Sequence, residues 1–328
     1  MMKKVNRREF MKITSAAAAG LVIGGGGNLF ASEENISQNQ RKRTLRIAHM
    51  TDVHVQPEKN AESWMVKCLH HIQNLEDKPD IIFNGGDSIM DSLAQEEDRV
   101  RKLWDIWKRV LKNECSLPIV HCIGNHDVWG WVKDKSKTNG TEPLYGKKWV
   151  LEIFGMKECY QSFDKAGWHF IVLDSTHDYE DAAYTAKLDE KQFQWLKDEL
   201  EKTDSKTPVC VLSHIPILCA CAFFDGDNEK TGNWVVPHQW MHFDARRIKD
   251  LFYEHKNVKL CLSGHIHLLD RVDYNGITYL CNGAVSGNWW KGSYQETPPG
   301  YAVINLYDDG SFDHEYMTYG WKQAPESP

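Results

Sequence analysis

The sequence predicts an α/β sandwich, because short apolar runs alternate with amphipathic segments and polar clusters follow the apolar runs. The runs at 45–50, 81–84 and 119–123 are β-prone, and we read the last of them as a buried strand. Between them, residues 62–75 and 100–111 carry apolar side chains at helical spacing. A strand, a helix and a second strand in this order are typical of βαβ units.

The second half of the chain continues this alternation less regularly. Strands are predicted at 168–174, 209–212 and 258–262, and a helix at 192–200. Two hairpins follow: 272–280 turns at Asn275-Gly276, and 301–316 turns at 308–310. No Pro/Ser-rich linker and no internal repeat marks a second domain in the sequence.

The composition is that of an ordinary globular protein, with 41% hydrophobic and 26% charged residues and a net charge of −7. Removing residues 1–31 takes away five basic residues and one acidic residue, which leaves 34 basic against 45 acidic residues, a net charge of −11. Binding to a nucleic-acid duplex needs a basic surface, so this acidic chain gives no support for it.

The first residues resemble an export signal. Residues 6–12, Asn-Arg-Arg-Glu-Phe-Met-Lys, resemble the twin-arginine pattern, and residues 29–31 form a tolerable cleavage context. The apolar stretch 13–23 is too short and too rich in Gly, Ser and Ala to span a bilayer, so no stable membrane anchor is expected. This resemblance implies export of the folded protein by the twin-arginine (Tat) machinery to the periplasm or beyond. The alternative is a basic N-terminal segment that carries no targeting signal.

These features divide the chain into four parts. We expect a twin-arginine signal peptide at 1–31, a polar linker at 32–44, one catalytic domain at 45–320 and a C-terminal tail at 321–328.

The polar side chains at the predicted strand ends form a candidate metal-binding set. Their oxygen and nitrogen ligands, without thiolate, suit Mn²⁺, Fe or Zn²⁺. The set exceeds what one four-coordinate zinc uses and suits two divalent transition metal ions that share a bridging carboxylate. Each motif alone is also compatible with a polar turn. The residues are Asp52, His54, Asp87, Asn125, His214, His265 and His267.

Taken together, these motifs resemble the series found in calcineurin-like metallophosphoesterases. The series is Asp-x-His at 52–54, Gly-Asp at 86–87, Gly-Asn-His-Asp at 124–127, a lone His214 and Gly-His-x-His at 264–267. The resemblance implies a two-sheet β-sandwich flanked by helices, an αββα fold, with a dimetal centre at the sheet ends. It also implies a metal-dependent phosphoric ester hydrolase.

The resemblance assigns a role to each residue of the series. Asp87 would bridge the two ions, and His126 would lie beside the phosphate, where it donates to an oxygen or protonates the leaving group. Asp127 would orient the loop, although a plain turn carboxylate is an equal alternative. One ion would be held by Asp52, His54, Asp87 and His267, and the other by Asp87, Asn125, His214 and His265.

One position separates this chain from two branches of the family. Purple acid phosphatases carry a tyrosine three residues after the bridging aspartate, and the related protein phosphatases carry an aspartate there. This chain has Met90 at that position, and Asp91 is one residue away and is able to substitute. The chain therefore most resembles the bacterial phosphodiesterase branch, which includes cyclic-nucleotide and glycerophosphodiester hydrolases.

Substrate choice is expected to lie in the loops that follow the motifs. Asn125, Trp129 and Trp289 are the candidate substrate-binding residues, and the segment Ala222–Arg246 after His214 is rich in aromatic residues, since aromatic rings are able to stack on a base or a sugar. The same aromatics could instead pack the loops onto the body. We expect an exported phosphodiesterase with a small phosphate-ester substrate. The alternatives are a phosphomonoesterase with the same centre and a non-catalytic metal-binding module.

Overall fold

The computed structural model describes residues 41–180 and 182–322. The expected signal peptide and most of the expected linker and C-terminal tail lie outside these residues. One compact unit begins at Arg43, and the following concerns that unit.

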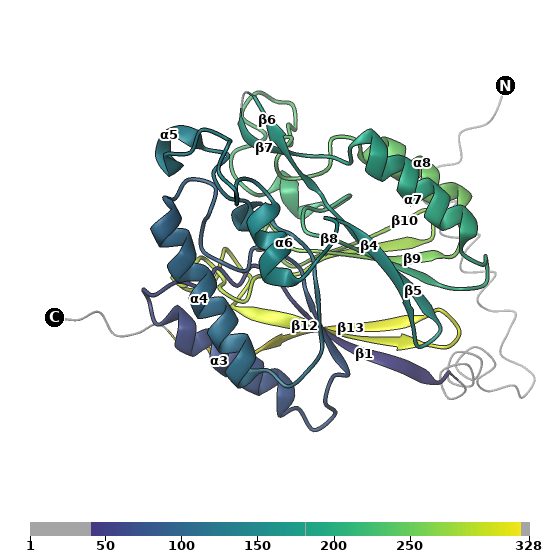
Figure 1. Cartoon of the computed structure of the whole chain (residues 1–328). Coiled ribbons are helices and arrows are strands. Elements are labelled where there is room, and N and C mark those ends of the chain that lie inside the picture. The colour runs from purple at the N-terminus through teal and green to yellow at the C-terminus, as the bar shows by residue number, and fades with distance from the viewer. Residues whose placement is uncertain (1–40, 181, 323–328) are drawn as a thin grey trace, which may run out of the picture. The chain divides into compact units, whose positions relative to one another are not determined.

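Two sheets form the centre of the unit (Figure 1). The five-stranded sheet has the order β13-β12-β1-β2-β3, and the six-stranded sheet has the order β10-β11-β9-β8-β5-β4. The first contains β1 (Arg43–Met50), β2 (Ile81–Asn84), β3 (Ile119–His121), β12 (Gly300–Tyr307) and β13 (Phe312–Thr318). The second contains β4 (Gln161–Lys165), β5 (Trp168–Leu173), β8 (Val209–Ser213), β9 (Val258–Ser263), β10 (Asp270–Tyr274) and β11 (Ile277–Cys281).

Alternation along the strands places apolar side chains on both faces of each sheet. In β2, Phe83 packs between the sheets with Phe170 of β5, whereas its neighbour Ile82 faces the helices. Helices α3 (Ala61–Gln73) and α4 (Glu97–Glu114) cover the outer face of the five-stranded sheet. Helices α7 (Glu190–Lys202) and α8 (Ala245–Glu254) cover the outer face of the other (Figure 1). The predicted two-sheet sandwich flanked by helices is confirmed.

The parallel strands at the centre of each sheet position the motifs. β1, β2 and β3 run parallel, and so do β5, β8, β9 and β11. Parallel strands end at the same edge of a sheet, so the loops that follow them meet there. The hairpin predicted at Asn275-Gly276 is present, and both residues have the positive φ that a type I′ turn requires, 54° and 81°.

The structure differs from the sequence prediction at several elements. The strand predicted at 119–123 is shorter and half-buried, because β3 is the edge strand of its sheet and has one neighbour. Sequence reasoning missed α8, β4, the hairpin β6 (Thr176–Tyr179) and β7 (Ala182–Ala186), the short helices α5 (Lys133–Ser136) and α6 (Lys148–Phe154), and two 3₁₀ turns, Asn125–Asp127 and Cys221–Phe223. Among the described residues, no helix is both long and apolar enough to cross a bilayer.

Candidate metal centre

The loops that follow β1 and β2 bring the first motifs together. The backbone N–H of Asp52 donates to the Gly86 carbonyl at 3.0 Å, and that of His54 donates to the Asp87 carbonyl at 3.0 Å. Six of the seven predicted ligands are buried, and His265 is half-buried. Residues separated by up to 215 positions therefore face a common interior point rather than solvent.

One group of predicted ligands consists of Asp52, His54 and His267, whose ligand atoms lie within 4.8 Å of one another. The Nε2 atoms of His54 and His267 are 3.1 Å apart. Asp52 Oδ1 lies 3.4 Å from Nε2 of His267 and 3.9 Å from Nε2 of His54. Three donor atoms thus converge on one point.

The second group consists of Asp87, His214 and His265, again within 4.8 Å. His214 Nε2 is 3.3 Å from Asp87 Oδ2 and 3.1 Å from Asn125 Oδ1. The same Asp87 Oδ2 lies 3.7 Å from His54 Nε2 of the first group. Asp87 therefore stands between the two groups, which is the position that a bridging carboxylate requires.

Hydrogen bonds fix the direction in which three imidazoles present their lone pairs. His214 donates from Nδ1 to the Gly85 carbonyl at 2.8 Å, and His267 donates from Nδ1 to the Gly287 carbonyl at 2.5 Å. His265 donates from Nε2 to the Gln239 carbonyl at 3.0 Å. A proton on one ring nitrogen leaves the other as an acceptor, and metal-binding histidines are commonly oriented in this way.

Buried polar atoms without partners mark the places where cations fit. Within the described residues, Asp52 Oδ1 and His265 Nδ1 are buried and have no hydrogen-bond partner. An unpaired buried carboxylate oxygen costs roughly 1–3 kcal/mol or more, so native proteins rarely leave one without a reason. Both atoms belong to the converging groups, and a divalent cation in each group would satisfy them. The residues present fit two metal ions.

The backbone at these residues is strained. Five of the seven predicted ligands have a positive φ, namely Asp52 (53°), His54 (47°), Asp87 (52°), His265 (71°) and His267 (62°). Residues with a side chain rarely adopt this conformation, and each instance costs on the order of 1 kcal/mol. Such strain gathers where function fixes the side chains, so its concentration here supports a functional site.

Two glycines allow the loops to approach one another. A Cβ atom on Gly124 would clash with Asp87, and one on Gly264 would clash with Thr51 and Asp52. The glycines of the Gly-Asn-His-Asp and Gly-His-x-His motifs are therefore needed for packing.

The ionisation of most of the ligands suits metal binding. His214 is the exception, because burial opposes its charge but Asp87 and Asp52 outweigh burial and raise its pKa to about 9, so it gives up a proton when it binds an ion. Burial opposes the charge on Asp52, but His267 outweighs it and holds the pKa of that carboxyl below its ordinary value. Burial likewise opposes the charge on Asp87, and His214 and His126 lower its pKa. Burial lowers the pKa of His54 and of His265 to about 3. Ionised carboxylates and neutral imidazoles are the forms that bind metal.

His126 lies at the edge of the same site. Its ring meets that of His54 at 4.9 Å and 88°, and its backbone N–H donates to Asp87 Oδ1 at 2.8 Å. Its Nδ1 atom is 3.6 Å from Asp91 Oδ1. Burial opposes the charged imidazolium, but Asp87 and Asp91 together raise the pKa of His126 to about 9. Asp91 thus brings a carboxylate to the ring from the position after Met90.

Comparison with known proteins now decides the family. The model of the calcineurin-like phosphoesterase family matches residues 45–269. The chain belongs to this family. A dimetal phosphatase from Danio rerio has the same fold, with a TM-score of 0.56 and 13% identity over 85% of this chain and 100% of that one.

Two relatives illustrate the range of this phosphoesterase family. A probable cyclic nucleotide phosphodiesterase of Synechococcus is 24% identical over 274 residues, 82% of this chain and 90% of the relative. Purple acid phosphatase 22 of Arabidopsis thaliana is 28% identical over 214 residues, 63% of this chain and 42% of the relative. The chain thus spans less than half the length of the plant relative. Family and relatives indicate a metal-dependent phosphoester hydrolase, in agreement with the predicted enzyme class.

Asp127 of this phosphoesterase does not face the cavity. Its Oδ1 accepts the Ser88 N–H at 2.8 Å, and its Oδ2 accepts the Gly124 N–H at 3.0 Å. One oxygen joins this loop to the segment after β2 and the other closes the turn of its own loop, which fits the loop-orienting interpretation.

Trp129, predicted to bind substrate, lies in the core instead. It is 2% exposed, its ring packs edge-to-face on Trp149 at 5.1 Å, and its indole N–H donates to the Gln95 carbonyl. The chain turns away from the site after His126, which directs this side chain toward α4 and α6. Trp289, in contrast, lies at the site, with its ring 4.5 Å from that of His267.

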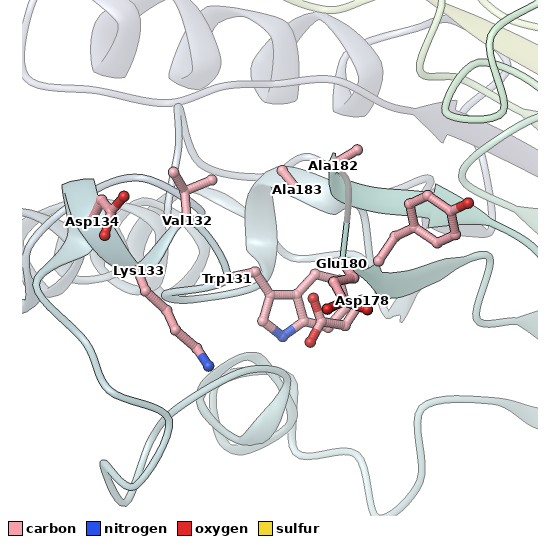
Figure 2. Close-up of a pocket in the computed structure, with 9 residues that line it drawn as sticks. Trp131, Val132, Lys133, Asp134, Asp178, Glu180, Ala182 and Ala183 are labelled. Carbon is pink, nitrogen blue, oxygen red and sulfur yellow. The ribbon is translucent and has the colours of Figure 1, made fainter.

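The site opens into a cavity of about 360 Å³ lined by Asp87, His126, His265 and His267. Four further lining residues were not predicted to bind substrate: Tyr184, Asp225, Trp240 and Tyr294. The Ala222–Arg246 segment was noted as aromatic, but no sequence signal directed Tyr184 or Asp225 to the site. Hairpin β6–β7 also lines another cavity, of about 570 Å³, with Trp131–Asp134 (Figure 2). That cavity contains none of the predicted ligands.

Proposed function

We propose that this chain is a phosphodiesterase that uses two divalent transition metal ions, Mn, Fe or Zn, and acts on a small phosphodiester. The observation that carries the proposal is the convergence of two ligand groups on the shared carboxylate of Asp87, with His126 beside them in one cavity. Ions bound there would supply Lewis acidity toward a phosphoryl group.

The ligand atoms divide naturally between two ions. Asp52, His54 and His267 would hold one ion together with Asp87 Oδ2. Asn125 Oδ1, His214 and His265 would hold the other with the same oxygen. Asn125 was predicted both as a metal ligand and as a substrate contact. We favour the role of metal ligand, because its Oδ1 lies 3.1 Å from Nε2 of His214.

His126 is the residue proposed to act on the substrate. It lines the cavity and is one quarter exposed, so its ring is accessible to a phosphate ester. A protonated imidazole is able to donate to a phosphoryl oxygen or to protonate the leaving alkoxide. Asp91 is a positioning residue, whose carboxylate lies 3.6 Å from Nδ1 and favours the protonated form of the ring.

The lining of the cavity favours a diester over a monoester. A monoester dianion gains from a second cationic side chain, yet no lysine or arginine is among the described residues that line this cavity. Four aromatic side chains are available instead for a second ester group. The likeness to a probable cyclic nucleotide phosphodiesterase over 90% of its length supports the same choice.

Hydrolysis of two chromogenic esters tests the proposal. Protein loaded with Mn²⁺ or Zn²⁺ should hydrolyse bis-p-nitrophenyl phosphate with a higher kcat/KM than p-nitrophenyl phosphate, and the His126→Ala variant should lose about 10²–10⁴-fold in kcat. The reverse preference would establish the phosphomonoesterase. Turnover of neither ester by metal-loaded protein would favour the non-catalytic metal-binding module.

We also propose that the protein is exported by the Tat machinery to the periplasm or beyond, on the strength of Arg7-Arg8 and the apolar stretch that follows. Replacing both arginines with lysine should retain the full-length chain in the cytoplasmic fraction. Unchanged export of the Lys-Lys variant would contradict this proposal.

A further inference from the structure

We propose that the alcohol of the phosphodiester substrate carries a compact ammonium group, bound in a cage of Trp289, Tyr294, Trp240 and Asp225. This inference rests on the proposed phosphodiesterase function and specifies its substrate class. All four residues line the cavity that also contains His126 and His267, so a ligand whose phosphate lies at the metal centre has its second ester group within their reach.

Two walls of the cage stand at a right angle to each other. The rings of Trp289 and Tyr294 are 5.7 Å apart at 80°, and Trp289 also lies at 4.5 Å from His267. A planar nucleobase prefers two parallel faces, whereas a tetrahedral ammonium group contacts perpendicular ring faces equally well. Aromatic cages of this kind bind quaternary ammonium ions through the negative faces of the rings.

The protein holds Trp289 in place by a strained loop. Trp289 and Trp290 both have a positive φ, 46° and 67°. The neighbouring indole of Trp290 is buried and donates its N–H to the His54 carbonyl at 2.9 Å. Two consecutive aromatic residues in a conformation that favours glycine indicate that the direction of the Trp289 ring is fixed against the metal centre.

Asp225 supplies the negative charge of the cage. The Tyr294 hydroxyl donates to Asp225 Oδ1, and Gln295 donates to the adjacent Phe224 carbonyl at 3.1 Å, so the two loops are joined. Gly226 lies against the Trp240 ring, where a Cβ atom would come within 3.1 Å. The carboxylate is thereby held by Tyr294, and the next residue of its loop lies against Trp240.

Outside the proposed metal centre and His126, the charges that line the cavity favour a cation over an anion. The ionisable groups there are the Asp225 carboxylate and the tyrosine hydroxyls, and the described lining contains no lysine or arginine. The Lys59 ammonium donates from Nζ to the Trp289 carbonyl at 3.1 Å, but Lys59 is not among the lining residues. A substrate with a second phosphate or a carboxylate would thus meet Asp225 without a compensating cation.

Three p-nitrophenyl diesters test the proposal on metal-loaded full-length protein. They are p-nitrophenyl phosphorylcholine, its isostere with an uncharged alcohol, p-nitrophenyl 3,3-dimethylbutyl phosphate, and the smaller p-nitrophenyl phosphorylethanolamine. All release the same chromophore, so differences in kcat/KM report the other alcohol. We expect at least one of the two cationic esters to exceed the isostere by about tenfold, since a cation–π contact with a nearby carboxylate is worth about that factor.

The choice between the two cationic esters identifies the ammonium group. A preference for the choline ester indicates a quaternary ammonium group held by the rings, and a preference for the ethanolamine ester indicates a primary amine that donates to Asp225. Either result supports the inference.

Two variants of one loop locate the effect. Asp225→Asn should lower the preference for the cationic ester over the isostere by about fivefold to tenfold. Asp227→Asn removes the same charge two residues away, from an exposed carboxylate paired with Lys230, and should leave the preference unchanged.

The results separate this inference from the proposed function. Hydrolysis of bis-p-nitrophenyl phosphate with equal rates for the isostere and both cationic esters would overturn the cage and leave the phosphodiesterase standing. A higher kcat/KM for p-nitrophenyl thymidine 5′-phosphate than for both cationic esters would also overturn the cage, in favour of a base-stacking site. A preference that Asp225→Asn and Asp227→Asn reduce equally would refute the assignment of Asp225.

Discussion

Replacing Asp91 with asparagine tests whether this carboxylate serves His126 from the position after Met90. Asp91 Oδ1 lies 3.6 Å from His126 Nδ1 and also accepts the Leu93 N–H at 2.8 Å. The amide oxygen of asparagine is able to keep the Leu93 hydrogen bond. The substitution therefore removes the charge and leaves the local backbone intact.

The expected loss follows from the distance and the exposure. At 3.6 Å, two unit charges attract each other by roughly 1 kcal/mol in water and by about 4–5 kcal/mol at an effective dielectric constant near 20. The two side chains are 25% and 19% exposed, which places them between these limits. We take about 1.4–2.8 kcal/mol, which corresponds to a 10- to 100-fold lower kcat.

The assay is hydrolysis of bis-p-nitrophenyl phosphate by metal-loaded Asp91→Asn, with metal content and thermal unfolding measured on the same samples. Asp105→Asn is the matched control, because it removes an equal charge from the exposed face of α4, where Asp105 forms an ion pair with Lys108. A kcat within twofold of wild type, at full metal content, would refute the positioning role. An equal loss in Asp105→Asn would point to net charge instead.

Three further predictions concern the metal centre and the body of the protein. Chelation of the metal should lower Tm by roughly 5–8 °C, because an ion present at 100 times its Kd adds about 2.7 kcal/mol to the free energy of unfolding. Adding Mn²⁺ should restore Tm. Calorimetry that shows no shift would contradict this prediction. Trp129→Phe should lower the free energy of unfolding by about 1–3 kcal/mol in urea and leave KM within twofold, because Trp129 is a core residue. Asp244→Asn should cost about 1–2 kcal/mol at pH 7, since Asp244 accepts hydrogen bonds from Leu188 and His242. Burial opposes its charge, but His242 lowers the pKa of Asp244, so this contribution is present at neutral pH and the difference from wild type should shrink below about pH 4.

The strands that precede the motifs could be predicted from the sequence, and the reason is physical. β2, β5, β8 and β9 are covered on both faces, and such strands read as continuous apolar runs. The polar residue that follows each run then lies at the sheet edge. By the same logic, Asp87, His214, His265 and His267 were expected at one edge of the sheets, whereas Asp52, His54 and Asn125 follow β1 and β3, which are less completely covered, and joined the set through the motif series.

Elements that lack an apolar run followed by polar residues were not predicted. Hairpin β6–β7 is half-exposed, its strands are short, and β7 consists mainly of alanine, so neither hydrophobic alternation nor a turn residue marks it. Helix α8 did carry a signal, with Ile248, Leu251 and Phe252 at helical spacing, but it follows a loop noted only for its aromatic residues. Trp129 was predicted to bind substrate because it is near His126 in the sequence. The direction of a side chain after a turn depends on tertiary contacts, which the sequence alone does not give.

The energetics of the centre connect metal binding to the proposed route of export. The described fold keeps several ligands in the left-handed region and leaves Asp52 Oδ1 and His265 Nδ1 buried without partners. These costs oppose folding of the metal-free chain, and an ion that binds only the folded state offsets them. A pathway that carries folded proteins would transport this centre with its ions already in place. A pathway for unfolded chains would instead leave the strained loops to form and to acquire metal after export.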